Sequence, residues 1–173
     1  TTGDELVKPG QSLKYGQVYE SNSVMLDAAF KSKGISNITH LKIQDDYQAT
    51  VAAIQSVTES NDFVILSGGI SVGDYDFGGK AVQEVAVEQV FYKVKQKPGK
   101  PLYFGKKGKT TIFALPGNPA AALTSFYVYI YPALPQSQGG EFKGCQRLKL
   151  PLAENYSRQA QRSAFLNGNL SDG

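Results

Sequence analysis

The chain has 173 residues, 41% of them hydrophobic and 19% charged, with a formal net charge of +3, which is typical of a globular domain with a core and a smaller appended unit. It contains no apolar run of about 18 residues and a single cysteine, Cys145, so the sequence predicts neither a membrane span nor a disulfide framework, and we expect a cytoplasmic protein. Its single histidine, His40, leaves few soft ligands, so a zinc, haem or iron–sulfur site is not expected and any metal should be a hard cation bound by oxygen atoms.

The first part of the chain alternates helix and strand patterns. It opens on TTGDEL, which resembles a loop without a preceding strand, so we expect a fragment of a longer protein whose first strand is missing. Residues 21–33 have apolar side chains at helical spacing, with Ser or Asn available as the N-cap and Gly34 as the stop signal. Residues 38–43 alternate like a strand, and the two aspartates that follow can cap a second helix at about 47–59.

The middle of the chain changes from this alternation to a run of strands. Residues 62–66 are a continuous apolar run that ends in SGG, which is typical of a buried parallel strand before a glycine-rich turn. A short helix is expected near 79–86. Residues 88–115 then predict a hairpin region, in which the turns KPGKP and GKKGK separate strand-like segments.

A further helix is predicted over residues 119–133. Asn118 is its expected N-cap and Pro119 its first helical residue, while Pro132 and Pro135 are expected to end it. The repeated strand–helix order predicts an α/β three-layer sandwich, with a mostly parallel sheet covered by helices on both faces.

The helical patterns stop after about residue 136, and short extended segments with turn residues follow. We therefore predict an α/β domain over 1–136 and the start of a truncated C-terminal β domain over 137–173.

Basic residues are concentrated in the hairpin region. Such density favours an anionic ligand, although a solvated lysine-rich hairpin is the alternative. The lysines are not interleaved with a recognised nucleic-acid-binding motif, so a nucleic-acid partner is not expected. The stretch holds seven of the 18 basic residues, namely Lys93, Lys95, Lys97, Lys100, Lys106, Lys107 and Lys109.

Three loops qualify as ligand-binding loops, because ligands of an open α/β sheet bind beyond the carboxyl ends of its strands. The loop TTGDEL offers a hydroxyl, a glycine and two acids. In SGGISVGDYD, glycines allow backbone amides to converge on an oxyanion, and in LPGNPAAA the N-terminus of a helix can hold a phosphate. An ordinary capped helix start is the alternative for the last loop. The candidate binding residues are Thr2, Gly3, Asp4, Ser67, Gly68, Gly69, Ser71, Gly73, Pro116, Gly117, Asn118 and Pro119.

Acids and lysines in these segments suggest chemistry on an anionic substrate. Carboxylates pair in two loops, Asp4 with Glu5 and Asp74 with Asp76, as a magnesium site requires, although turn-forming acids are the alternative. The KPGKP turn places Lys97 and Lys100 on either side of a bend, so that both ammonium groups could face one anion.

These motifs occur in the order and spacing of a known family. The segments TGDEL, ESN, DD, SGGISVGDYDF, KPGKPLYFG and LPGNPAAAL resemble those of the molybdopterin molybdenumtransferases, a family that includes the E domain of gephyrin, over about residues 1–135. Molybdopterin adenylyltransferases of the wider superfamily share some of these motifs, but KPGKP together with PGNP favours the molybdenumtransferase branch.

The resemblance implies an enzyme that inserts molybdate into adenylylated molybdopterin and releases AMP, with the substrate's phosphates over the SGG and PGNP loops. It implies Glu5, Asp76, Lys97 and Lys100 as catalytic residues, and Mg²⁺ bound by Glu5, Asp74 and Asp76. Pro116 and Pro119 would shape the pocket. It also implies a homodimer in the full-length protein and a molybdopterin adenylyltransferase as partner. Adenylyl transfer, a gephyrin-like scaffold and a sheet domain that binds no pterin remain as alternatives.

Overall fold

A four-stranded sheet forms the centre of the protein in the computed structural model. Its strand order is β3 (Phe63–Ser67), β7 (Thr110–Leu115), β6 (Tyr103–Lys107) and β4 (Glu88–Tyr92). Among these described strands, β3, β7 and β4 point the same way and β6 runs against them, so the sheet is mostly parallel, as predicted. The structure describes residues 1, 5–43, 46–68, 77–141, 148–159 and 161–170.

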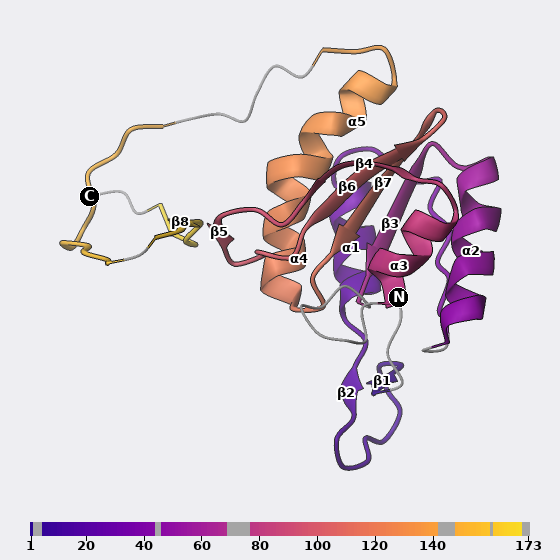
Figure 1. Ribbon diagram of the computed structural model, residues 1–173. Coiled ribbons are helices and arrows are strands. Elements are labelled where there is room, and N and C mark those ends of the chain that lie inside the picture. The colour runs from indigo at the N-terminus through magenta and orange to yellow at the C-terminus, as the bar shows by residue number, and fades with distance from the viewer. Residues whose placement is uncertain (2–4, 44–45, 69–76, 142–147, 160, 171–173) are drawn as a thin grey trace.

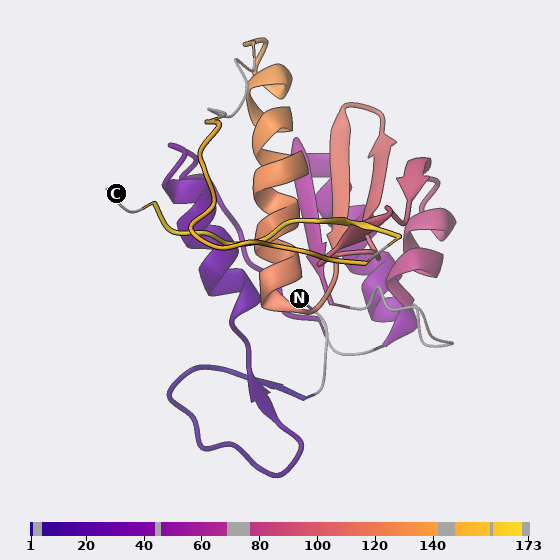
Figure 2. The same ribbon diagram turned by 90° about the vertical axis from the view of Figure 1, so that its left-hand side faces the viewer.

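Helices cover both faces of the sheet (Figures 1 and 2). One face carries α1 (Asn22–Lys31) and a long helix made of α4 (Pro119–Ser125), the π-helical η1 (Phe126–Ile130) and α5 (Tyr131–Ser137). The other face carries α2 (Tyr47–Ser60) and α3 (Phe77–Glu84). The predicted three-layer sandwich is confirmed. No helix in the described part of the chain is long and apolar enough to cross a membrane.

Strand β7 divides the core into two layers because successive side chains of a strand point to opposite faces. Ile112 and Ala114 pack with α2 and α3, whereas Phe113 and Leu115 pack with α1 and α4. All four are 3% exposed or less. This burial on both faces explains why the strand is a continuous apolar run.

Two predicted helix caps are present and one is replaced. Asp46 accepts a hydrogen bond from the Ala49 amide at 2.7 Å, and Asn118 accepts one from the Ala121 amide at 3.1 Å. Ser21 occupies the N-cap position of α1 but makes no capping hydrogen bond with its side chain. The carboxylate of Glu20 instead accepts the Ser23 amide at 2.9 Å, because its longer side chain reaches the same donor.

The last helix continues through its prolines to Ser137, so the predicted end at Pro132 and Pro135 is wrong. The Tyr131 amide donates to the carbonyl of Phe126, five residues earlier, instead of four. This wider π-helical turn changes the hydrogen-bond register directly before Pro132, where the proline's missing N–H would interrupt an α-helix.

Residues 38–43 do not form the predicted strand. Only their last residues pair, and both bonds join Thr1: its amino group donates to Leu41 O at 2.8 Å, and Ile43 N donates to Thr1 O at 3.1 Å. A strand needs a hydrogen-bonded neighbour along its length, and the described residues supply a neighbour only at this end.

Two short strand pairs lie outside the central sheet. The pair β1 (Leu6–Val7) and β2 (Val18–Tyr19) forms the base of a protrusion beyond the main body (Figure 1). The pair β5 (Gln96–Lys97) and β8 (Ser163–Ala164) joins the hairpin region to the C-terminal segment.

Gly105 in β6 lies where the sheet leaves no room for a side chain. A Cβ atom there would lie 2.7 Å from Val87 Cγ1, 2.8 Å from the carbonyl oxygen of Glu88 and 2.8 Å from Tyr103 Oη. We expect Gly105→Ala to lower the free energy of unfolding by about 1–3 kcal/mol, because the backbone carbonyl cannot move away cheaply. Urea unfolding measures this, with Gly168→Ala, whose Cβ would meet nothing within 4 Å, as the control. Equal stability of the two variants would contradict the prediction.

Candidate functional site

The SGG and PGNP loops leave the sheet side by side. Strands β3 and β7 are parallel neighbours, and their last residues, Ser67 and Leu115, are paired in register. The loops that follow therefore start at the same edge, which is where open α/β sheets bind ligands. Ser67 is buried, and Gly68 is partly exposed at the start of its loop.

The PGNP loop combines a buried residue with an exposed rim. Pro116 is buried against the core, whereas Gly117, Asn118 and Pro119 are exposed. Asn118 caps the helix through the Ala121 amide. The first amides of this helix lie at the exposed rim, where an anion could interact with them.

The lysine turn, which we define as residues 96–100, packs on α4. Gly99 is buried so closely that a Cβ atom there would lie 3.2 Å from Ser125 Oγ and 3.6 Å from Ala121 O. Lys97 and Lys100, on either side, are exposed. The turn is therefore held against the first turns of the helix that follows the PGNP loop.

A buried glutamine fixes the lysine turn. Gln96 is 2% exposed; its Nε2 donates to Pro98 O at 3.0 Å, and its Oε1 accepts a hydrogen bond from the Tyr129 hydroxyl. Burial raises the pKa of Tyr129, so its phenol remains protonated and can donate. The C-terminal segment adds a backbone bond from Phe165 N to Lys97 O at 2.9 Å.

The structure divides the lysine-rich stretch into two parts. Tyr103 pairs with Ala114 near the carboxyl end of β7, whereas Lys107 pairs with Thr110 at its amino end. Lys106, Lys107 and Lys109 therefore lie at the opposite end of the sheet from the PGNP loop. Lys93 directly follows β4, and its amide bonds Leu102 O at 2.9 Å, so residues 93–100 lie toward the end of the sheet where β7 meets the PGNP loop. Within this stretch, the lysine turn places Lys97 and Lys100 on either side of the glycine that packs on α4.

The acidic part of the predicted site is only partly described. Glu5 is exposed, and its carbonyl accepts the Val18 amide at 2.9 Å. No group of three His, Cys, Asp or Glu side chains suited to a metal occurs within the described ranges, so the fit of Mg²⁺ rests on residues beyond them. The predicted residues that lie outside the described residues are Thr2, Gly3, Asp4, Gly69, Ser71, Gly73, Asp74 and Asp76.

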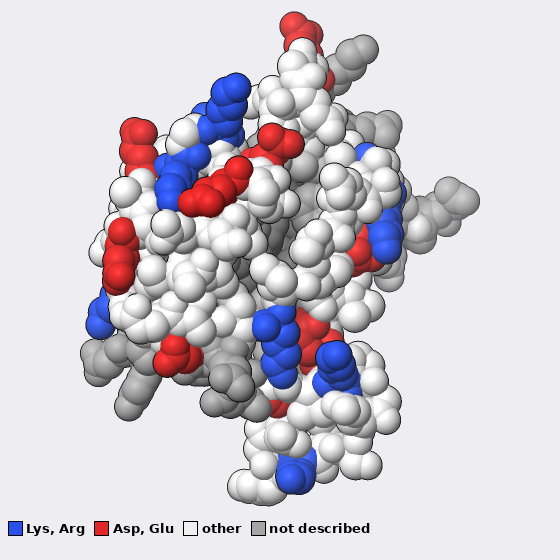
Figure 3. All heavy atoms as spheres, turned by 90° about the vertical axis from the view of Figure 1, so that its right-hand side faces the viewer, with Lys and Arg blue, Asp and Glu red and all other residues white. Residues whose placement is uncertain are grey.

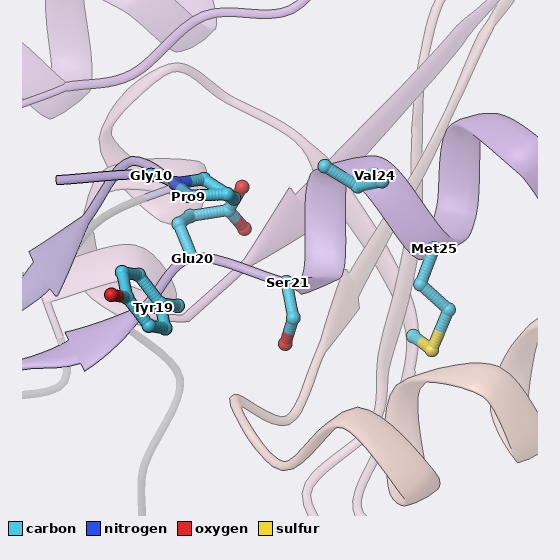
Figure 4. A pocket seen from close by; sticks show the side chains of 7 residues that line it. All are labelled: Pro9, Gly10, Tyr19, Glu20, Ser21, Val24 and Met25. Carbon is cyan, nitrogen blue, oxygen red and sulfur yellow. The ribbon is translucent and has the colours of Figure 1, made fainter.

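The surface over α2 and α3 has no large patch of positive charge alone or negative charge alone. Acidic and basic side chains are interspersed on that face, and most of it is uncharged (Figure 3). Away from the two loops, a pocket of about 400 Å³ opens between the protrusion and α1 (Figure 4). None of its lining residues is basic, so it does not suit a phosphate. They are Pro9, Gly10, Tyr19, Glu20, Ser21, Val24 and Met25.

Sequence reasoning missed the residue that joins the two main loops. Asn22, the first residue of α1, donates hydrogen bonds from Nδ2 to Ser67 Oγ and to Gly117 O, each at 2.8 Å. Its only signal in the sequence was its place in the ESN motif. Gln96 was also missed, although it directly precedes KPGKP.

The sequence that forms this sheet and these loops matches a known protein family. Residues 1–136 match the family described as "Probable molybdopterin binding domain". The chain belongs to this family.

Two relatives extend the comparison. The chain is 38% identical over 144 residues to molybdopterin molybdenumtransferase 2 from Mycobacterium tuberculosis, which covers 80% of this chain and 36% of that protein. It is 37% identical over 139 residues to molybdopterin molybdenumtransferase from Haemophilus influenzae, covering 80% of this chain and 34% of that protein. The chain thus spans about a third of the length of these relatives.

A solved structure supports the same relationship. The molybdopterin biosynthesis protein from Pyrococcus horikoshii superposes with a TM-score of 0.69 at 32% sequence identity. The match covers 82% of this chain and 35% of that one. Family and fold are therefore established for the molybdopterin-binding part.

Proposed function

We propose that this chain carries the pterin-binding part of a molybdopterin molybdenumtransferase, which inserts molybdate into adenylylated molybdopterin and releases AMP. The main support is the joining of the SGG and PGNP loops by Asn22, with the lysine turn packed on the helix that follows the second loop. A substrate with two linked phosphate groups needs amides, hydroxyls and positive charge at one edge of the sheet.

Each part of the site has a role in this proposal. The substrate's phosphates bind at Ser67 and Gly68 and at the rim of the PGNP loop, from Gly117 to Pro119. Lys97 and Lys100 attract molybdate and the phosphates and hold them in place. The two dithiolene thiols lose their protons and bind molybdenum, and one molybdate oxygen takes up both protons and leaves as water. A second water molecule cleaves the bond between the two phosphates, and AMP departs. The dithiolene binds the molybdenum, so no protein thiol is required.

Further parts of the proposal concern Mg²⁺ and assembly. Glu5, Asp74 and Asp76 would hold Mg²⁺, which would neutralise the charge that develops on the departing phosphate. Pro116 would shape the wall of the pocket. We also propose that the full-length protein is a cytoplasmic homodimer and receives its substrate from a molybdopterin adenylyltransferase, with the C-terminal residues 137–173 beginning a separate β domain.

Removal of either lysine charge is expected to weaken substrate binding at least tenfold. A charge-assisted hydrogen bond contributes about 1.5–3 kcal/mol, and each tenfold change in affinity corresponds to about 1.4 kcal/mol. The experiment is calorimetric titration of the chain with adenylylated molybdopterin and Mg²⁺, comparing the native chain with Lys97→Ala and Lys100→Ala.

Lys109→Ala is the matched control, because it removes the same charge at the opposite end of the sheet. An equal loss in this variant would show that overall charge alone determines the affinity. If the native chain binds no pterin, the proposed function is wrong. Conversion of molybdopterin and ATP into the adenylylated product would instead indicate an adenylyltransferase.

A further inference from the structure

Asn22 connects the two loops that the proposed function requires. It is 8% exposed, and its side chain contacts the last residue of β3 and the loop after β7 through Nδ2 bonds to Ser67 Oγ and Gly117 O, both 2.8 Å long. These partners are 45 and 95 residues away in sequence. One carboxamide therefore fixes the distance between two loops that are far apart in the sequence.

The orientation of the carboxamide follows from its partners. The carbonyl oxygen of Gly117 can only accept a hydrogen bond, so the atom facing it must be Nδ2. Oδ1 is then buried without a hydrogen-bond partner among the described residues. A buried acceptor without a partner costs stability, whereas an apolar side chain of similar size would avoid that cost.

We propose that Asn22 is a positioning residue for the phosphate-binding edge of the site. This inference rests on the proposed function and names a residue that acts through Ser67 and Gly117. Asn22 holds both loops in place before the ligand binds. The entropic cost of ordering these loops on binding is therefore smaller. Because the buried Oδ1 of Asn22 has no hydrogen-bond partner in the described part of the chain, stability alone does not explain an asparagine here.

The test separates positioning from folding by replacing Asn22 with an apolar side chain of similar volume. In Asn22→Leu both donors and the unpartnered acceptor disappear together. We expect the affinity of the chain for molybdopterin, measured by calorimetry, to fall at least tenfold. The urea midpoint should fall, because Ser67 Oγ and Gly117 O lose their donor, and the affinity is therefore compared under conditions in which circular dichroism shows both proteins fully folded.

A conservative variant and a control sharpen the comparison. Asn22→Asp keeps the shape of the side chain but has no donor for Gly117 O, so we expect it to lose affinity as well. Asn61→Leu makes the same chemical change at the C-cap of α2, where Nδ2 of Asn61 donates to Val57 O. Asn61 precedes β3, so it lies at the end of that strand opposite to Ser67. The affinity of Asn61→Leu for molybdopterin should therefore equal that of the native chain.

A measurement without ligand tests whether Asn22 holds the two loops in place. Hydrogen exchange at the amides of Ala121 and Ala122, which donate to Asn118 in the PGNP loop, should become at least tenfold faster in Asn22→Leu, while exchange in α2 should not change. Unchanged exchange at these two amides would overturn the inference.

The binding outcomes distinguish this inference from the proposed function. If native chain and Asn22→Leu bind molybdopterin equally, the positioning role is wrong and the proposed function stands. If a smaller folded fraction of Asn22→Leu explains the whole loss of affinity, the positioning role is also wrong, since Asn22 would then contribute only to stability. If the native chain does not bind molybdopterin, the proposed function fails, and the positioning role fails with it.

Discussion

Phe126→Ala is expected to lower the free energy of unfolding by about 3–5 kcal/mol, because it leaves a cavity that the surrounding side chains cannot fill. Phe126 is fully buried, and its ring lies edge-on to Phe30 at a centroid distance of 4.9 Å. The residue lies in the π-helical segment between α4 and α5, so the cavity would open between the long helix and α1. Domains of this kind unfold with about 5–15 kcal/mol, so the loss is a large share of the total.

The control for this prediction is Phe165→Ala, which removes the same side chain from a position that is 41% exposed. We expect a change of about 0.5 kcal/mol or less for that variant. Urea unfolding followed by circular dichroism measures both. Equal losses in the two proteins would show that the packing around Phe126 is not tight.

The features that the sequence predicted correctly are those set by neighbouring residues. The strands β3 and β7 follow from the continuous apolar runs in their own segments. The caps Asp46 and Asn118 also act within three residues of their own position. From this strand–helix order, chain connectivity alone implied a mostly parallel sheet with helices on both faces.

The incorrect predictions depend on contacts with distant residues. Residues 38–43 have the alternation of a strand, but pairing requires a neighbour, and Thr1 reaches only the end of the segment. Pro132 is a strong local stop signal, yet packing of Ile130 before it and Leu134 after it in the core holds the helix on both sides. Tertiary packing therefore overrides a local preference.

In the candidate site too, some features could be predicted from the sequence, whereas others depend on contacts between distant residues. The loops after Ser67 and Leu115 could be placed together because parallel neighbouring strands end at one edge. Asn22 could not be found from spacing, since it lies 95 residues from Gly117. Likewise, the stretch of lysines looked continuous, but the turn of the chain between β6 and β7 carries Lys109 away from Lys97.

Gly99→Ala is expected to disrupt the lysine turn and weaken binding of adenylylated molybdopterin at least tenfold. Gly99 has φ +90°, and an added Cβ would lie 2.9 Å from Gln96 Nε2 and 3.2 Å from Ser125 Oγ. The left-handed backbone costs an alanine about 1–2 kcal/mol, and overpacking costs about 1–3 kcal/mol. Relief requires the Gln96 carboxamide to shift, which breaks its bond to Pro98 O and loosens the turn that carries Lys97 and Lys100.

Gly34→Ala separates the two causes, because Gly34 has φ +80° but no atom within 4 Å of an added Cβ. It should lose about 1–2 kcal/mol of stability from backbone strain alone and keep native affinity. Urea unfolding gives the stability of both variants, and calorimetric titration gives their affinity. Native binding by Gly99→Ala would show that the lysines need no fixed turn. Weak binding by Gly99→Ala alone would mean that contact with α4 places the two charges beside the PGNP loop.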